Sequence, residues 1–217
     1  MMRLDKKTSH SYIEQCYGPE NDLKLLSRTA AEKLGLGGIS ISQTEAHMIQ
    51  FFLQMIKPQK IVEIGTLTGL SCQYFLEALQ TDGMVYSLEK SEEHFEISQK
   101  ILKPWIDKNK CQLILGDARE KLKEITSQGP FDAIFIDGNK SAYLDYWHWA
   151  EANVKKGGLI IIDNVFLSGS VWDGPKYKFS EKQIQTMKTM TDEILENSNF
   201  QSSFIPTDEG LLLALKK

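Results

Sequence analysis

The sequence predicts an α/β fold: a doubly wound, mostly parallel sheet of seven strands with an antiparallel C-terminal hairpin and additional N-terminal helices. From residue 60 onward, short apolar runs alternate with longer amphipathic segments. Strands that are apolar on both faces and alternate with helices are typical of a parallel sheet covered on both sides. The last two apolar runs are separated only by residues 206–210, so they can pair only as an antiparallel hairpin.

The first 58 residues are predicted to be helical. Ser42 and Glu45 form a capping-box pattern before an apolar run that Pro58 ends. The helices are expected at 11–17, 22–34 and 46–56. A chain of 217 residues is long enough for one sizeable domain. We therefore expect a single domain over 1–217, with a helical cap at 1–58 and an α/β core at 59–217.

The core is expected to alternate strands and helices in a regular order. Strands are predicted at 60–65, 84–89, 111–116, 131–137, 159–163, 201–205 and 211–215, and helices at 71–80, 92–106, 119–127, 142–154 and 181–197. In an open α/β sheet, ligands bind beyond the carboxyl ends of the strands, near the point where the strand order reverses. The residues that follow each strand are therefore the candidates for chemistry.

Composition excludes several classes of protein. The formal net charge is −4, from 25 basic and 29 acidic residues, and no long basic run is present, which argues against nucleic acid as a partner. Cys16, Cys72 and Cys111 are far apart and have no CxxC spacing, so reduced thiols are expected. The amino end is polar, and no apolar stretch reaches the about 20 residues of a membrane helix. We expect a cytoplasmic protein without a membrane partner.

The first three strands end in residues suited to a nucleoside ligand. The first ends in Glu63 and a Gly65-to-Gly69 turn, whose glycines allow a tight backbone turn, although a GxxxG pattern also occurs in ordinary turns. The second ends in Glu89, which could accept hydrogen bonds from both hydroxyls of a ribose, or simply be a surface carboxylate. The third ends before Asp117, which could cap the next helix or contact an adenine ring.

The next two strands end in Asp137 and in Asp163-Asn164. Neighbouring parallel strands bring such residues together, and three oxygen donors suit a hard cation, with Mg²⁺, Mn²⁺ and Ca²⁺ as candidates. The alternative is that these polar residues only mark the ends of buried strands. Lys140 follows the first aspartate by three residues, which favours a functional cluster.

These motifs resemble the caffeoyl-CoA and catechol O-methyltransferase family, including its small bacterial members. The resemblance runs from about residue 10 to the end of the chain. It is carried by EIGTLTGLS at 63–71, FDAIFIDGNKSAYLDY at 131–146, GGLIIIDNVFLSGSVWDG at 157–174 and IPTDEGLLLALKK at 205–217.

The resemblance implies a role for each matching residue. The residues that would surround S-adenosylmethionine are Glu63, Gly65, Thr66 and Ser71 at its methionine part, Glu89 at the ribose, Asp117 and Ala118 at the adenine, together with Tyr146 and Ile41. Ile41 stands where the family usually has a small polar residue, so only a backbone contact is expected there. Asp137, Asp163 and Asn164 would be the metal ligands, and Lys140 matches the family's general base.

Two departures from the plant members concern the acceptor. Asn139 stands where plant caffeoyl-CoA members carry an acidic residue. The segment 168–180, with Trp172, Lys176 and Tyr177, also differs from the plant pattern. We expect this segment to shape the acceptor pocket, which argues against a plant-like acyl-CoA substrate.

The function expected from the resemblance is S-adenosylmethionine-dependent methylation of a hydroxyl on a small catechol-like molecule, assisted by a divalent cation such as Mg²⁺. A vicinal diphenol is the expected acceptor, because a chelating metal favours two adjacent oxygens. A homodimer is expected from the resemblance alone. Three alternatives remain open: a nicotinamide-dependent oxidoreductase, a non-catalytic S-adenosylmethionine-binding protein, and a metal-independent methyltransferase that acts on nitrogen.

Overall fold

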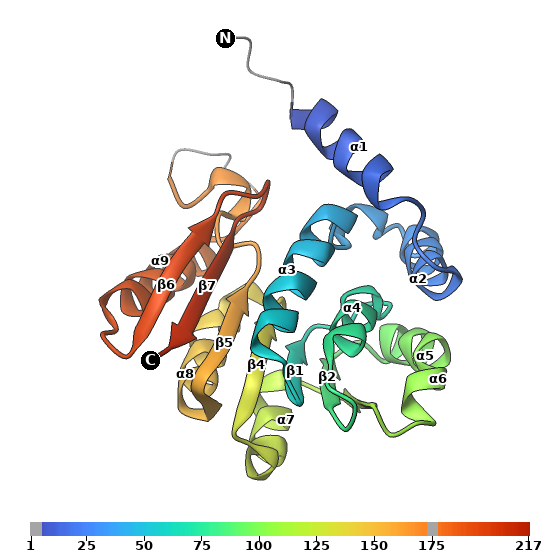
Figure 1. Ribbon diagram of the computed structural model, residues 1–217. Coiled ribbons are helices and arrows are strands. Elements are labelled where there is room, and N and C mark those ends of the chain that lie inside the picture. Colours follow the sequence, from blue (N-terminus) through green and yellow to red (C-terminus); the bar gives the residue numbers. More distant parts are fainter. Residues whose placement is uncertain (1–5, 173–177) are drawn as a thin grey trace.

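A seven-stranded sheet forms the centre of the molecule, in the order β3-β2-β1-β4-β5-β7-β6. The structure, a computed structural model, describes residues 6–172 and 178–217 (Figure 1). The strands are β1 Lys60–Ile64, β2 Met84–Glu89, β3 Cys111–Leu115, β4 Phe131–Ile136, β5 Val154–Ile162, β6 Phe200–Ile205 and β7 Leu211–Lys216. Strands β1 to β5 pair in parallel, and β7 is antiparallel to both β5 and β6. The predicted fold class and the closing hairpin are confirmed.

Helices cover both faces of this sheet. They are α1 Lys6–Tyr17, α2 Asp22–Lys33, α3 Gln43–Ile56, α4 Leu70–Ala78, α5 Glu92–Ile101, α6 Lys103–Ile106, α7 Ala118–Ile125, α8 Tyr143–Asn153 and α9 Glu181–Glu196. Single 3₁₀ turns lie at Gly37–Ile39, Thr126–Gln128, Lys140–Ala142 and Leu167–Gly169. In the described part of the chain, no helix combines the length and apolar character needed to cross a bilayer.

Two apolar cores lie on opposite faces of the sheet. On one face, Ile49 of α3 and Phe75 of α4 belong to the same buried cluster as Phe135 of β4. On the other face, Trp147 of α8 and Met187 of α9 are buried in a cluster with strand residues. Burial of a large apolar side chain contributes about 1.5–3 kcal/mol. Both cores therefore hold the strand ends in fixed positions, which is what a binding site at those ends requires.

Two predicted element boundaries were wrong for local reasons. The helix expected at 92–106 is divided at Leu102, because Pro104 has no N–H to donate to the carbonyl of Lys100. Val154 was expected to end a helix, but it begins β5 and pairs with Phe131. The register then shifts before Leu159 pairs with Ala133, so residues between them bulge out of the ladder.

The N-terminal helices contact the loop that follows β1. The Ser27 hydroxyl of α2 donates to the carbonyl of Thr68 at 2.8 Å, and the Thr68 hydroxyl donates to the carbonyl of Ser27 at 2.9 Å. Both residues are fully buried. The predicted capping box at Ser42 and Glu45 is present at the start of α3. The amino-terminal segment thus positions one wall of the site described next.

Candidate active site

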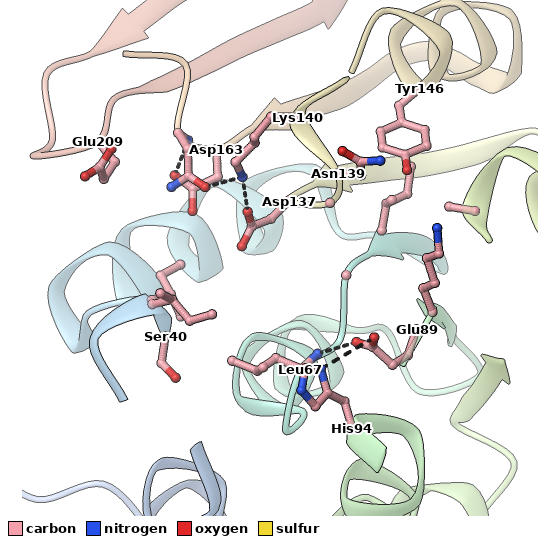
Figure 2. Close-up of a pocket in the computed structure, with 18 of the residues that line it drawn as sticks. Ser40, Leu67, Glu89, His94, Asp137, Asn139, Lys140, Tyr146, Asp163 and Glu209 are labelled. Carbon is pink, nitrogen blue, oxygen red and sulfur yellow. Dashed lines mark hydrogen bonds and ion pairs between the residues drawn. The ribbon is translucent and has the colours of Figure 1, made fainter. Parts of the chain in front are cut away.

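A cavity of about 740 Å³ opens at the carboxyl ends of the central strands. Its floor comes from the loops after β1, β2, β4 and β5, and the segment 38–42 with the start of α3 closes another side (Figure 2). The predicted site residues that line it are Ile41, Gly65, Glu89, Ala118, Asp137, Lys140, Tyr146, Asp163 and Asn164. The cavity lies where the strand order reverses between β1 and β4, as the fold predicts.

The glycine turn after β1 is shaped by backbone geometry. Gly65 has φ +100°, and a Cβ atom there would lie 2.1 Å from the carbonyl oxygen of Asp137. Gly69 has φ +82° and caps the amino end of α4. Only glycine meets both demands without strain, namely a positive φ and contact with a neighbouring backbone. Gly65 therefore lets the β1 and β4 ends lie together at the cavity floor.

Glu89 holds this turn and also faces the cavity. Its Oε2 accepts hydrogen bonds from the backbone N–H groups of Thr66 at 3.2 Å and Leu67 at 2.8 Å. Its Oε1 accepts from the N–H of Ser91 at 2.8 Å, and Nδ1 of His94 lies 3.7 Å from the same oxygen. A carboxylate offers about four acceptor positions, so one remains for a ligand hydroxyl. Glu89 is thus fixed in direction before any ligand arrives.

Glu63 lies behind the glycine turn and does not line the cavity. It is fully buried and accepts hydrogen bonds from the hydroxyls of Ser71 and Ser87. Burial raises the pKa of Glu63 to about 7, against the lowering effect of the two serine hydroxyls. Thr66 and Ser71 line a separate small cavity of about 30 Å³ beside the main one. The proposed contacts of these three side chains with a cofactor stay predictions.

Asp117 caps the amino end of α7, one of the two roles the sequence left open. Its carboxylate accepts from the backbone N–H of Arg119 at 3.0 Å and forms ion pairs with Arg119 and Lys90. The hydrogen bonds from the Arg119 side chain, more than any other cause, hold the pKa of Asp117 well below its usual range. The neighbouring Ala118 and Tyr146 line the cavity, whereas an adenine contact by Asp117 stays a prediction.

A polar cluster stands at the other end of the cavity, where β4 and β5 end (Figure 2). Nζ of Lys140 donates to Oδ1 of Asp137 at 2.8 Å, to the hydroxyl of Tyr143 at 2.6 Å and to Oδ1 of Asn164. An ammonium group has three hydrogens to donate, so these contacts satisfy it. The sequence named three of these four residues, but it did not indicate the buried Tyr143.

Asp163 shares this cluster and is nearly fully buried. Burial, together with the negative charge of Asp137, raises the pKa of Asp163 well above its usual range. Its Oδ1 accepts from the backbone N–H of Asn164 at 2.6 Å. Asn164 has φ +60°, a conformation that asparagine tolerates better than most side chains. This turn of the chain brings the Asn164 amide oxygen to Lys140.

The donor chemistry of this cluster fits a hard cation. Carboxylate and amide oxygens of Asp137, Asp163 and Asn164 line the same end of the cavity, and a positive charge, the Lys140 ammonium, already lies against two of these residues. Among residues 6–172 and 178–217, no three His, Cys, Asp or Glu side chains are grouped as they would be to hold a metal ion. The third predicted ligand is an amide, and its role stays a prediction.

Several residues that line the cavity were not predicted. They include His94 near Glu89, Glu45 of α3, Phe179, and Glu209 in the β6–β7 turn. Glu45 could be assigned from the sequence only as part of a capping box, and Glu209 only as part of a turn. Their contribution depends on tertiary packing that brings distant segments to one cavity.

The segment 168–180 was expected to shape the acceptor pocket. Lys178 and Phe179 line the cavity, and Trp172 packs against Phe166 with ring centroids 5.3 Å apart. Lys176 and Tyr177 lie outside the described residues. The role of this segment in acceptor choice stays a prediction.

The fold and the cavity define an α/β enzyme class with a ligand site at a topological switch point. Comparison with known proteins makes the class specific. The model of an O-methyltransferase family matches residues 14–217. A catechol O-methyltransferase of Niastella koreensis is 32% identical over 164 residues, which cover 75% of this chain and 74% of that protein. This chain belongs to the O-methyltransferase family, and the resemblance predicted from its motifs is confirmed.

Two further relatives extend this result. A caffeoyl-CoA O-methyltransferase of Stellaria longipes is 26% identical over 174 residues, covering 77% of this chain and 72% of that protein. The crystal structure of an O-methyltransferase from Bacillus cereus, solved in complex with S-adenosylhomocysteine, superposes with a TM-score of 0.87. The two chains are 25% identical, and the match covers 97% of each.

Proposed function

We propose that this enzyme transfers the methyl group of S-adenosylmethionine to a hydroxyl of a small catechol-like molecule, with the assistance of a divalent cation. One observation carries the proposal. A single cavity has Glu89 at one end and the cluster of Asp137, Lys140, Asp163 and Asn164 at the other. The relatives named for catechol and caffeoyl-CoA methylation, and the neighbour bound to S-adenosylhomocysteine, support it.

The Glu89 end is the proposed cofactor site. Glu89 has its carboxylate fixed by three backbone N–H groups, so it can accept hydrogen bonds from ribose hydroxyls without reorganisation. Ala118 and Tyr146 line the adjoining wall, which suits a flat purine ring. Ile41 contributes an apolar edge. The glycine turn lies between this end and the cluster, where the sulfonium would have to reach the acceptor.

The cluster is the proposed acceptor site. Methyl transfer from sulfonium is an in-line displacement, so the acceptor oxygen must approach the methyl carbon opposite the sulfur. Asp137, Asp163 and Asn164 would hold a divalent cation, which, when bound, lowers the pKa of a coordinated hydroxyl. Lys140 would accept the hydroxyl proton at Nζ. The fixed positions of these side chains at the ends of β4 and β5 would orient the acceptor.

Membership of the O-methyltransferase family argues against the nicotinamide-dependent alternative. A non-catalytic binding protein and a metal-independent enzyme acting on nitrogen make other predictions. The first would bind the cofactor without transfer, and the second would be insensitive to chelators.

The first test is methyl transfer from labelled S-adenosylmethionine to 4-methylcatechol, with Mg²⁺ and then with EDTA. We expect transfer with Mg²⁺ and a loss with EDTA of at least about 100-fold, because a metal typically supplies several kcal/mol of transition-state stabilisation. Addition of excess Mg²⁺ after EDTA should restore the rate. Transfer that is unchanged by EDTA would contradict metal assistance, and cofactor binding without transfer would contradict the proposed reaction.

We also propose that the enzyme is a homodimer. Phe51 and Met55 stand one turn apart on α3 and are 61% and 65% exposed. Large apolar side chains exposed together favour association with another surface. Light scattering after size exclusion should give twice the 24.7 kDa chain mass, and a Phe51→Glu variant should shift it toward the monomer. A wild-type mass of one chain at about 50 μM would contradict the proposal.

A further inference from the structure

The acceptor end of the cavity carries more negative than positive charge beyond the proposed metal cluster. Three carboxylates line the cavity there in addition to Asp137 and Asp163, and among the described residues Lys178 is the one further ammonium group that accompanies them. These carboxylates belong to Glu45, Asp208 and Glu209. A bound divalent cation, an ionised catechol oxygen and Lys140 would together balance the two aspartates, so the excess remains.

Glu45 brings one of these charges from the N-terminal cap. Its Oε2 accepts hydrogen bonds from the backbone N–H of Ser42 at 3.3 Å and from the Ser42 hydroxyl at 2.8 Å. These bonds favour the ionised form and fix the side chain beside the cavity. The charge of Glu45 also helps to raise the pKa of Asp163, so the two carboxylates are close enough to interact.

Glu209 brings a second charge from the turn between β6 and β7. Its carboxylate accepts from the backbone N–H of Ser168 at 3.0 Å and from the Ser168 hydroxyl at 2.9 Å. Nζ of Lys178 donates to the same hydroxyl at 2.8 Å and lies 3.9 Å from Oε1 of Glu209. Lys178 therefore offsets part of one charge, but it is 56% exposed and leaves the charge of Glu45 uncompensated.

We propose that the natural acceptor is a catechol whose ring carries a cationic substituent, and that Glu45 and Glu209 select for it. This inference rests on the proposed function and narrows its substrate class. A protonated amine on the ring would interact favourably with these carboxylates, whereas a carboxylate or an acyl-CoA chain would be repelled. Apolar lining residues, Ile39 and Phe179, strengthen both effects by excluding water from part of the pocket.

Three catechols with substituents of similar length test the proposal at pH 7: 4-(2-aminoethyl)catechol, 4-ethylcatechol and 3,4-dihydroxyphenylacetate. We expect kcat/KM to fall in that order, with the cationic and anionic acceptors at least about tenfold apart, equivalent to about 1.4 kcal/mol. Calorimetry on enzyme saturated with Mg²⁺ and S-adenosylhomocysteine should give the same order of affinities. If no catechol is methylated, the proposed function fails, while the measured affinities still decide the acceptor preference.

Two variants test which residues select. Glu45→Gln and Glu209→Gln keep the side-chain shape and remove one charge each, so each should narrow the cation-to-anion ratio by about 3–10-fold, with solvent screening part of the effect. Glu196→Gln at the exposed end of α9 makes the same change in net charge away from the cavity and should leave the ratio unchanged. A ratio near one in the wild type, or one unchanged in both variants, overturns the proposal.

The cofactor offers a competing explanation, because its sulfonium is also cationic. If Glu45 and Glu209 served the sulfonium, their glutamine variants would weaken binding of S-adenosylmethionine relative to S-adenosylhomocysteine and leave the order of the acceptors intact. That pattern would overturn the proposal. Equal losses, or none, for the two cofactor forms together with a narrowed acceptor ratio would support it.

Discussion

Replacement of Asp163 by alanine is expected to abolish cation-stimulated methyl transfer while the cofactor still binds. Asp163 ends β5 within the polar cluster, and its side chain is 93% buried, because only 7% of the residue is exposed. Its backbone N–H donates to the carbonyl of Ile136 at 3.0 Å, a bond that the substitution leaves in place. Loss of one of three proposed ligands should lower turnover by at least about 100-fold, the scale of several kcal/mol of metal stabilisation.

Mn²⁺ binding provides a readout independent of turnover. Paramagnetic resonance titration should show weaker Mn²⁺ binding in Asp163→Ala and in the closer isostere Asp163→Asn. Asp107→Ala removes an exposed carboxylate that pairs with Lys103 in a separate helix and serves as the matched control. An Asp163→Ala enzyme with unchanged Mn²⁺ affinity would show that the cation does not bind at this cluster, whatever the turnover.

The sequence was most informative where a strand ends. A buried strand must be apolar along its length, so the polar residues that follow it stand out, as Asp137, Asp163 and Glu89 do. Parallel pairing then places these residues at one edge of the sheet. This reasoning predicted the neighbouring positions of β4 and β5 and the line of site residues across the cavity floor.

The sequence was least informative where distant segments meet. Glu45 and Glu209 are 164 positions apart and both line the cavity, yet local patterns assign them only to a helix cap and a turn. The position of Glu63 behind the glycine turn also depends on packing, because its serine partners come from α4 and β2. Strand alternation cannot distinguish a carboxylate that reaches a ligand from one that is buried beside it.

Replacement of Lys140 by alanine is expected to lower turnover by about 10²–10⁴-fold, the usual contribution of a general base. Affinity for S-adenosylhomocysteine should stay within about threefold of the wild type, because each printed contact of Nζ is with the Asp137, Tyr143 and Asn164 side chains at the other end of the cavity. Single-turnover measurements with enzyme saturated in cofactor separate these two quantities.

Lys140→Arg separates proton transfer from charge. Arginine keeps the positive charge and can donate to Asp137 and Asn164, but it does not lose a proton at neutral pH. If Lys140 acts as a base, arginine should be nearly as inactive as alanine. If the positive charge only organises the cluster, arginine should restore most of the activity. Lys123→Ala, an exposed change on α7, controls for the loss of a lysine. A collapse of cofactor affinity in Lys140→Ala, with normal turnover of the bound enzyme, would show that the residue belongs to the cofactor site.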